Sequence, residues 1–258
     1  MPARAMGALL SLLGSRGSRA LRATTAPRAL HATAPSEPRY LVVGDVHGCL
    51  DELEDILQAA DYDATTTTLV LAGDLVNKGP KSAEVVAWCR RSGVAAVRGN
   101  HDEKCLRLRA ALDEDAAAPL DDEYAYVRDL SDEDVAWLAD LPYTLALPGA
   151  DAIVVHAGLV PHTPLENQPR DAMTTMRSLD ETGAPSRLPG ATGWAEHRDA
   201  GPLVIFGHDA VRGLQRHARA IGLDTGCCYG GRLTAVYLPD RTFVDVPARR
   251  VYAKPAYG

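Results

Sequence analysis

Asp, Asn and His residues recur in this chain in short blocks, and each block directly follows an apolar run. The blocks lie at residues 44–48, 73–80 and 98–102, at His156, and at 207–209. The preceding runs lie at 40–43, 68–72, 94–97, 152–155 and 203–206. Such short runs are typical of buried strands, so the polar side chains are expected along one sheet edge. Donors of this type can hold two cations that activate water, which predicts a dinuclear metal hydrolase of phosphate esters or anhydrides.

The first two blocks suit a shared ion. Asp45 and His47 are two residues apart after the first run, so both side chains can turn toward one cation. Asp74 follows the second run, and a carboxylate with two oxygens can bridge a pair of ions. Any one of these residues alone would more often be a hydrogen-bonded core residue. The repeated placement of the set beside strand ends favours a metal site.

Charge separates the start of the chain from the rest. Residues 1–36 contain five arginines and no acid, although the net charge of all 258 residues is −7. The remainder is therefore more acidic still, which excludes a general nucleic-acid surface. A small anionic phosphate substrate must be attracted by the metals and a few placed cations. No apolar run is long enough to span a membrane, and the oligomeric state stays open.

The composition of residues 1–36 is typical of an organellar transit peptide, with an unprocessed tail as the alternative. Mitochondrial localisation is the first expectation; plastid, or cytoplasm if the tail is no signal, are the others. A metal-binding hydrolase domain is expected at 38–250. Five cysteines without Cys-x-x-Cys spacing predict reduced thiols that mostly pack in the core. A strained disulfide between Cys227 and Cys228 is disfavoured.

The five blocks in order resemble those of the calcineurin-like metallophosphoesterases, from Asp45 to His208, with weaker similarity to about Val246. Ser/Thr protein phosphatases of that superfamily carry Asp-Arg where this chain has Asn77-Lys78. Residues 223–235 are similar to bacterial symmetrical diadenosine tetraphosphatases. Residues 77–80 and 207–215 resemble the eukaryotic ApaH-like phosphatases most. The resemblance implies a four-layer α/β/β/α sandwich, in which two mixed sheets are flanked by helices.

The resemblance also implies the ligand set. The first ion would take Asp45, His47 and Asp74. The second ion would take Asp74, Asn100, His156 and His208. This mixed N/O set without thiolates suits Mn, Fe, Zn or, less well, Mg. A hydroxide that bridges the two divalent ions would be the nucleophile.

Further roles come from the same resemblance. His101 would be the general acid that protonates the leaving oxygen. Its orienting Asp is replaced by Asn77, so Asp102 or a backbone carbonyl is the alternative partner. Lys78 stands where the family has a phosphate-clamping Arg. The remaining cations are Arg98, for which buttressing is slightly favoured over substrate contact, and Arg177 and Arg198, which are candidate clamps or ordinary surface residues.

Several functions fit these motifs. The leading one is hydrolysis of a phosphoanhydride or phosphoester in a dinucleoside polyphosphate, polyphosphate or capped RNA. A Ser/Thr phosphoprotein phosphatase is the first alternative, and a non-catalytic scaffold of the same fold is the second. A nuclease ranks third because the body of the chain is acidic. Residues 160–202, rich in Pro, Gly and charge, are expected to form a lid or substrate-recognition region.

Overall fold

Two β-sheets carry the functional residues at their edges. The computed structural model describes residues 29–34 and 39–255. The five-stranded sheet has the order β13 (Thr242–Pro247), β12 (Arg232–Leu238), β2 (Tyr40–Val43), β3 (Thr68–Leu71), β4 (Ala95–Ala96). The six-stranded sheet has the order β1 (His31–Thr33), β5 (Thr144–Leu147), β6 (Ala152–Val155), β9 (Leu203–Phe206), β11 (Ala220–Gly222), β10 (Gln215–Arg216). Both contain parallel and antiparallel pairs, as expected for mixed sheets.

Alternation along the strands shows how the two sheets pack. In β2, Leu41 and Val43 join a core beneath the helices, whereas Val42 faces a core between the sheets. In β9, Ile205 joins that inter-sheet core, and Phe206 joins a third cluster on the outer face of the six-stranded sheet. Successive strand side chains point to opposite faces, so these strands are apolar on both sides. The four-layer α/β/β/α arrangement predicted from the sequence is therefore present.

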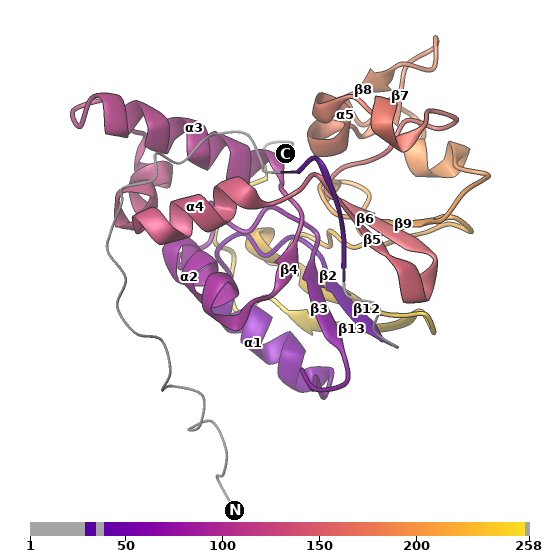
Figure 1. Ribbon diagram of the computed structural model, residues 1–258, viewed down its shortest axis with the longest axis horizontal. Coiled ribbons are helices and arrows are strands. Elements are labelled where there is room, and N and C mark those ends of the chain that lie inside the picture. Colours follow the sequence, from indigo (N-terminus) through magenta and orange to yellow (C-terminus); the bar gives the residue numbers. More distant parts are fainter. Residues whose placement is uncertain (1–28, 35–38, 256–258) are drawn as a thin grey trace, which may run out of the picture.

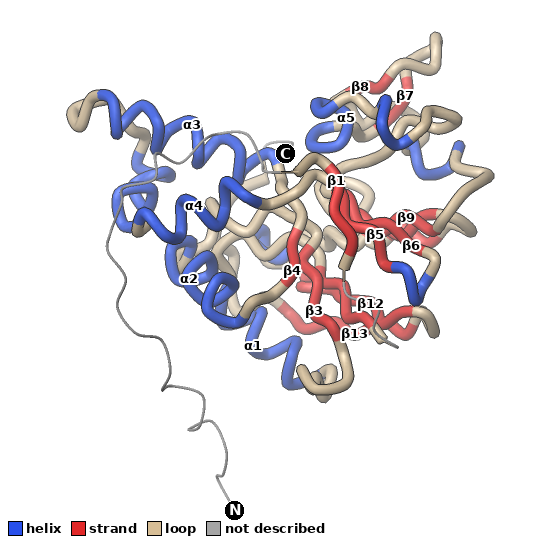
Figure 2. The backbone as a smooth tube through the Cα atoms, viewed as in Figure 1, coloured by secondary structure: helices blue, strands red, loops and turns tan. Residues whose placement is uncertain are grey.

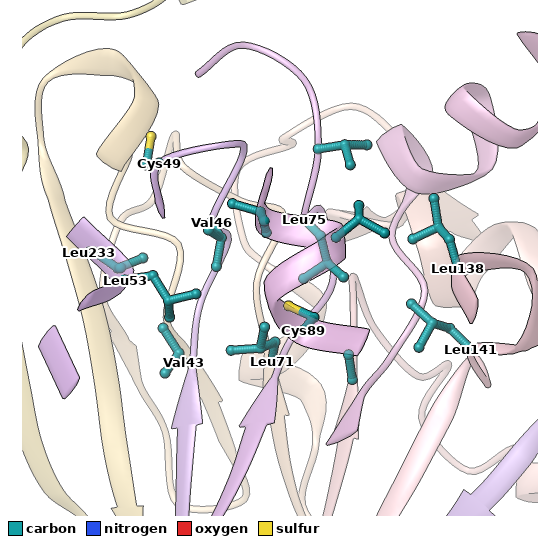
Figure 3. Packing of buried hydrophobic residues seen from close by; sticks show 14 of the residues in the cluster. Val43, Val46, Cys49, Leu53, Leu71, Leu75, Cys89, Leu138, Leu141 and Leu233 are labelled. Carbon is teal, nitrogen blue, oxygen red and sulfur yellow. The ribbon is translucent and has the colours of Figure 1, made fainter. Parts of the chain in front are cut away.

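The outer helical layers differ in thickness. One face of the five-stranded sheet is covered by four helices: α1 (Leu50–Ala59), α2 (Ser82–Ser92), α3 (Asn100–Glu114) and α4 (Asp132–Asp140) (Figure 1). The 3-10 helix η1 (Asp122–Asp129) lies between α3 and α4 in the chain. Leu53, Cys89 and Leu138 pack there against β2 and β3 (Figure 3). The other sheet carries α5 (Arg170–Thr175) and short 3-10 helices: η2 (Pro148–Ala150), η3 (Leu165–Asn167) and η4 (Trp194–His197). This second layer is mostly loop (Figure 2).

The region predicted as a lid, residues 160–202, has more structure than its sequence indicates. It contains η3, α5, η4 and the hairpin of β7 (Ser178–Leu179) and β8 (Pro185–Ser186). Trp194 in η4 is buried and donates its indole N–H to the Ala157 carbonyl at 3.0 Å. Trp194 therefore anchors the region beside His156.

The predicted boundary of the N-terminal tail differs from the structure. Strand β1 pairs in parallel with β5, and His31 Nδ1 lies 2.7 Å from Thr144 Oγ1. Ala34 is also buried. Residues 29–34 thus belong to the folded domain, although they lie within the tail expected at 1–36. The rest of that expected transit peptide lies outside the described residues. Among the described residues, no helix is long and apolar enough to cross a membrane.

Candidate metal centre

The six predicted ligands meet where the strands of both sheets end. Asp45 and Asp74 follow the parallel strands β2 and β3, and His156 and His208 follow the parallel strands β6 and β9. Parallel strands present their carboxyl ends at one edge, so two sheets bring four such turns together. Asn100 opens α3 and is partly exposed, whereas the other five ligands are buried.

Asp74 lies at the centre of the site. Its Oδ2 is 3.5 Å from His47 Nε2 on one side and 3.4 Å from His156 Nε2 on the other. Asp45 Oδ2 lies 3.9 Å from His47 Nε2, and Asn100 Oδ1 lies 3.1 Å from His156 Nε2. The ligand atoms form two overlapping groups: His47, Asp74 and His101, and Asp74, His156 and His208. Asp74 is therefore placed to bridge two ions.

Backbone carbonyls fix the ring orientation of all three ligand histidines. His47 Nδ1 donates to the Val76 carbonyl at 3.0 Å, and His156 Nδ1 donates to the Ala72 carbonyl at 2.9 Å. His208 Nε2 donates to the Thr175 carbonyl at 3.1 Å. A neutral imidazole has one N–H, so each ring keeps its other nitrogen as an acceptor or metal ligand. This second layer of hydrogen bonds is typical of metal-binding histidines.

The backbone around the predicted ligands is strained and closely packed. His47, Asp74 and His208 all have positive φ, at 47°, 48° and 65°, in the left-handed region that is unfavourable for side-chain-bearing residues. A Cβ added to Gly207 would collide with the Asp45 carboxylate. Strained backbone of this kind persists when packing over-determines it, and it clusters at functional sites.

The electrostatics of the site favour cations. Burial, with the neighbouring Asp224 carboxylate, raises the pKa of Asp45 well above its ordinary value. Burial also opposes ionisation of Asp74, but its electrostatic and hydrogen-bonding interactions with the neighbouring histidines, His156 first, outweigh burial and hold the pKa of Asp74 well below the usual range. Buried carboxylates are stable only when they are paired or coordinate a cation. The carboxylates and the imidazole lone pairs thus fit two divalent ions.

The family model described as calcineurin-like phosphoesterase matches residues 38–226. The chain belongs to this family. Its members use two divalent metal ions, and the paired ligand groups around Asp74 agree with that use. The chain is therefore a metal-dependent hydrolase of phosphoric ester or anhydride bonds.

Several relatives of the chain in this family are tetraphosphatases. The chain is 30% identical to a symmetrical bis(5'-nucleosyl)-tetraphosphatase of Janthinobacterium sp. (strain Marseille), over 79% of this chain and 94% of the relative. It is 28% identical to the asymmetrical bis(5'-nucleosyl)-tetraphosphatase PrpE of Halalkalibacterium halodurans, over 81% of this chain and 94% of the relative. A crystal structure described as a "putative diadenosine tetraphosphatase" is 38% identical, with a TM-score of 0.77, and covers 85% of this chain and 98% of its own. The predicted branch of the phosphoesterases is confirmed.

One cavity of about 690 Å³ opens onto the metal centre of this phosphoesterase. Five of the six predicted ligands line it: Asp45, His47, Asp74, Asn100 and His208. Lys78, Asn77, His101 and Arg177 line it too. The cavity therefore joins the metal ligands to most of the predicted substrate-binding residues.

His101 is held by Asn77, as its position in the motif indicates. Asn77 Nδ2 lies 3.0 Å from His101 Nδ1 and also donates to the Tyr124 hydroxyl at 3.0 Å. Burial and the charge of Lys78 lower the pKa of His101 to about 4, despite the opposing effect of Asp74. A neutral amide cannot stabilise imidazolium by charge as a carboxylate would. His101 is therefore neutral near pH 7 in this arrangement.

Asp102, the alternative partner considered for the His101 ring, has a structural position instead. Its carboxylate accepts hydrogen bonds from the Leu75 N–H at 2.9 Å and the Gly99 N–H at 2.8 Å. It is fully buried and does not line the cavity. Asp102 thus fixes the start of α3 to the turn after β3, and Asn77, not Asp102, holds the His101 ring.

Two of the predicted cations are directed away from the centre. Arg98 is fully buried, and its Nη2 donates to the Leu138 carbonyl at 3.2 Å and to the Ala139 carbonyl at 2.5 Å, at the end of α4. Arg198 lines a separate cavity and donates to the Pro202 carbonyl at 3.1 Å. Of the two roles considered for each residue, the structure agrees with buttressing for Arg98 and gives Arg198 no contact with the metal cavity. Arg98 therefore buttresses the ligand loop.

Lys78 and Arg177 remain as cations of the site. Lys78 Nζ lies 2.9 Å from His47 Nε2 and 5.0 Å from the centre of the Tyr229 ring. The Asp74 charge raises the pKa of Lys78 to about 12 in spite of its burial. Arg177 donates to the His208 carbonyl at 3.3 Å. Both cations face the cavity where phosphates would lie.

The cavity contains residues that the motif-based reasoning did not assign. Asp224 follows β11 as Asp45 follows β2, so the strand-then-Asp pattern was a signal for it. Tyr229 adds a half-buried aromatic ring, whereas Tyr124 is buried and accepts a hydrogen bond from Asn77 through its hydroxyl. Lys254, near the C-terminus, also lines the cavity, and no motif or periodicity marks it in the sequence.

Proposed function

We propose that this phosphoesterase hydrolyses dinucleoside polyphosphates at its metal centre. The observation that carries the proposal is that one cavity of about 690 Å³ combines five of the six predicted metal ligands, three cationic side chains and the half-buried Tyr229. That volume falls within the range of cavities that enclose ligands of nucleotide size. The substrate is thus a small anionic phosphate carrying bases.

The mixed lining favours a nucleotide over inorganic polyphosphate. Lys78 and Arg177 can bind phosphate oxygens, and the half-buried Tyr229 offers a ring on which a base can stack. A bare polyphosphate would use only the cations. Capped RNA shares the required chemistry at its pyrophosphate end, but the acidic body of the chain gives a long RNA little to bind.

The proposed ligand assignment comes from the family resemblance, and Asp74, which belongs to both groups of donor atoms at the site, would be shared by the two ions. Asp45, His47 and Asp74 would hold one ion, and Asp74, Asn100, His156 and His208 would hold the other. When bound, the ions supply Lewis acidity toward a phosphoryl oxygen and activate water as a nucleophile at neutral pH. We infer manganese as the metal, because carboxylate and amide oxygens together with imidazole nitrogens suit Mn²⁺. The same donor set can also bind Fe, Zn or Mg.

His101 completes the proposed chemistry as a proton donor to the leaving oxygen. With Nδ1 facing the Asn77 amide N–H, the ring proton lies on Nε2. Lys78 and Arg177 orient the phosphates, and Asp102 positions His101 only through the start of α3. A substrate that brings several negative charges favours protonation of the ring. The Nδ1–H of the protonated ring would then be accepted by the Asn77 carbonyl oxygen, which is buried and has no hydrogen-bond partner among the described residues.

The proposal is tested with manganese-loaded protein and a panel of substrates. We expect diadenosine tetraphosphate to be cleaved faster than tripolyphosphate, capped RNA or phosphopeptides. Chromatography of the products separates two ADP from ATP plus AMP, and so distinguishes symmetrical from asymmetrical cleavage. Preferential turnover of phosphopeptides would support the Ser/Thr phosphatase alternative and overturn the proposal. A lack of turnover with every substrate and metal would support the scaffold alternative.

We also propose mitochondrial localisation. The support is the arginine-rich, acid-free composition of residues 1–36. A fluorescent protein fused behind residues 1–36 should enter mitochondria, and plastid or cytoplasmic fluorescence would contradict this.

A further inference from the structure

A second cluster of donor atoms lies behind the turn that carries His47. One ligand atom each from Cys49, Glu52 and Cys227 lies within 4.8 Å of the others. All three residues are buried, with at most 2% of their surface exposed. The cluster contains sulfur, which none of the predicted catalytic ligands has. It is therefore a different chemical environment from the centre around Asp74.

The cluster joins two distant parts of the chain. Cys49 caps the start of α1, and Glu52 lies in its first turn, so their side chains share one face of the helix. Cys227 begins the 3-10 helix η5 (Cys227–Tyr229), which follows β11. Cys49 lies at the margin of the large core cluster, apart from Cys89 (Figure 3). The cluster thus links the loop of His47 to η5.

Glu52 is only partly satisfied by the protein. Its Oε1 accepts hydrogen bonds from the Arg249 N–H at 2.9 Å and from the Tyr252 hydroxyl at 2.7 Å. Its Oε2 is buried and has no hydrogen-bond partner among the described residues. A buried carboxylate oxygen without a partner is costly, so the arrangement lacks a donor or a cation at this point.

Two sulfurs and a carboxylate oxygen suit a thiophilic ion. Zn²⁺ takes thiolate ligands at about 2.3 Å and carboxylate ligands at about 2.0–2.2 Å, so tetrahedral ligand atoms lie roughly 3.5–3.8 Å apart. The spacing of the cluster admits this geometry. Hard ions such as Mg²⁺ or Mn²⁺ prefer oxygen donors and are disfavoured here.

We infer that Cys49, Glu52 and Cys227 form a buried site for one thiophilic divalent cation of the Zn²⁺ type, separate from the catalytic ions. Binding releases the two thiol protons and is coupled to folding, because the closed site must be loaded as the chain folds. The ion holds η5 against the loop of His47. Since η5 also carries Tyr229, whose ring contacts Lys78, the ion stabilises one wall of the catalytic cavity.

Cobalt tests this inference with a readout independent of activity. Full-length protein produced in cobalt-supplemented medium should show a thiolate-to-cobalt charge-transfer band in the near ultraviolet. The catalytic ligands contain no sulfur and cannot give this band. We expect Cys49→Ala and Cys227→Ala to lose it, together with about one cobalt ion per chain.

Two further variants act as controls. Cys89→Ala removes an equally buried thiol outside the cluster and should keep the band. Asp74→Asn should also keep the band, even where it abolishes turnover. A failure of the proposed hydrolase function therefore leaves the cobalt test intact. Likewise, the absence of the cobalt band would not contradict the hydrolase function.

Three results would overturn the inference. One is wild-type protein without the band, and another is a band that survives Cys49→Ala or Cys227→Ala. The third is an intact mass two hydrogens lower without bound cobalt, which would mark the thiols as a disulfide-forming pair. If the variants do not fold, X-ray absorption of the zinc-loaded wild type decides, because sulfur scatterers support the site and nitrogen and oxygen alone contradict it.

Discussion

Along the metal-binding edge, every predicted ligand lies within four residues of a strand end, and five of the six are buried. In residues 160–202, by contrast, the longest element is the six-residue α5, and many side chains are exposed, as Leu188 is at 68%. The first region is held by two sheets and by carbonyl contacts to its histidines. The second is anchored chiefly through buried residues such as Trp194.

This contrast assigns different tasks to the two regions. Groups that must hold ions at fixed separations need the rigidity of strand ends and tight turns. Groups that only select a substrate can lie on loops, where sequence changes alter the fold little. In this phosphoesterase, residues 160–202 contribute a single predicted cation, Arg177, to the cavity. Substitutions on the edge should therefore abolish turnover, and those in 160–202 should alter substrate preference.

The largest effect is expected from Asp74→Asn. The amide cannot bridge two cations by charge, so we expect kcat to fall by about 10³-fold or more, or roughly 4 kcal/mol. Mn²⁺ should raise the melting temperature of the wild type, because a ligand that binds only the folded state stabilises it, and this rise should be smaller in the variant. Activity near wild type would contradict the bridging position of Asp74.

His101→Ala should lower kcat by about 10²-fold, which is typical of the loss of a general acid. Metal content and the Mn²⁺-dependent rise in melting temperature should remain, because His101 is not one of the six ligands. Steady-state kinetics and metal analysis on the same sample check this. His197→Ala, at an exposed position in η4, is the control and should be fully active.

Arg177→Ala and Arg198→Ala test the two sides of region 160–202. Arg177 faces the metal cavity, so its loss should raise KM for a dinucleoside polyphosphate about tenfold, or about 1.4 kcal/mol, with a smaller change in kcat. Arg198 lines the other cavity, and its variant should match the wild type within about twofold. An equal loss in both variants would contradict the division between the cavities.

The smallest expected effect is a change in stability at Asp134 in α4, which lies outside both the metal-binding edge and residues 160–202. Arg90 Nε donates to Asp134 Oδ1 at 2.7 Å, and the Ser131 hydroxyl donates to Asp134 Oδ2 at 2.7 Å. Burial alone would raise the pKa of Asp134, but these hydrogen bonds outweigh it and lower the pKa. Asp134→Asn should thus cost about 0.5–1 kcal/mol of unfolding free energy at pH 7.

The sign of the pH dependence follows from that lowered pKa. A carboxyl with a depressed folded-state pKa stabilises the fold above its unfolded value of about 3.9 and loses the contribution as pH falls through the folded value. The difference between Asp134→Asn and wild type should therefore shrink below about pH 4 in urea unfolding. Asp140→Asn, at an exposed position at the end of the same helix, is the matched control variant.

The metal-binding edge could be predicted from the sequence because strands and ligands are adjacent in the chain. A short apolar run followed by Asp or His fixes both the burial and the place of the donor, as for Asp45 and His156. The four-layer sandwich, by contrast, was implied by the family resemblance and not by the apolar runs themselves. The helix start at Ser131 also follows a local pattern, since a Ser before three acidic residues is typical of a helix N-terminus, and its hydroxyl accepts from the Asp134 N–H at 3.1 Å.

The cationic side chains could not be predicted in this way. Arg98 lies between a strand and a ligand, yet its guanidinium turns to the end of α4, whose position depends on tertiary packing. Arg198 and Arg177 lie in the same irregular region, and only three-dimensional contacts separate their cavities. Lys254 reaches the site through the course of the C-terminal segment, which has no periodicity to interpret. Local pattern therefore predicts donors at strand ends better than it predicts long, flexible side chains.

Strand β1 has a practical consequence for any shortened form of the protein. It covers the outer edge of β5, and a sheet edge without such cover exposes N–H and C=O groups that can pair with other molecules. A version that starts at residue 37 would lose this cover and should aggregate more readily than one that starts at residue 29. Under the proposed mitochondrial localisation, the same limit predicts that removal of the N-terminal segment would stop ahead of Ala29.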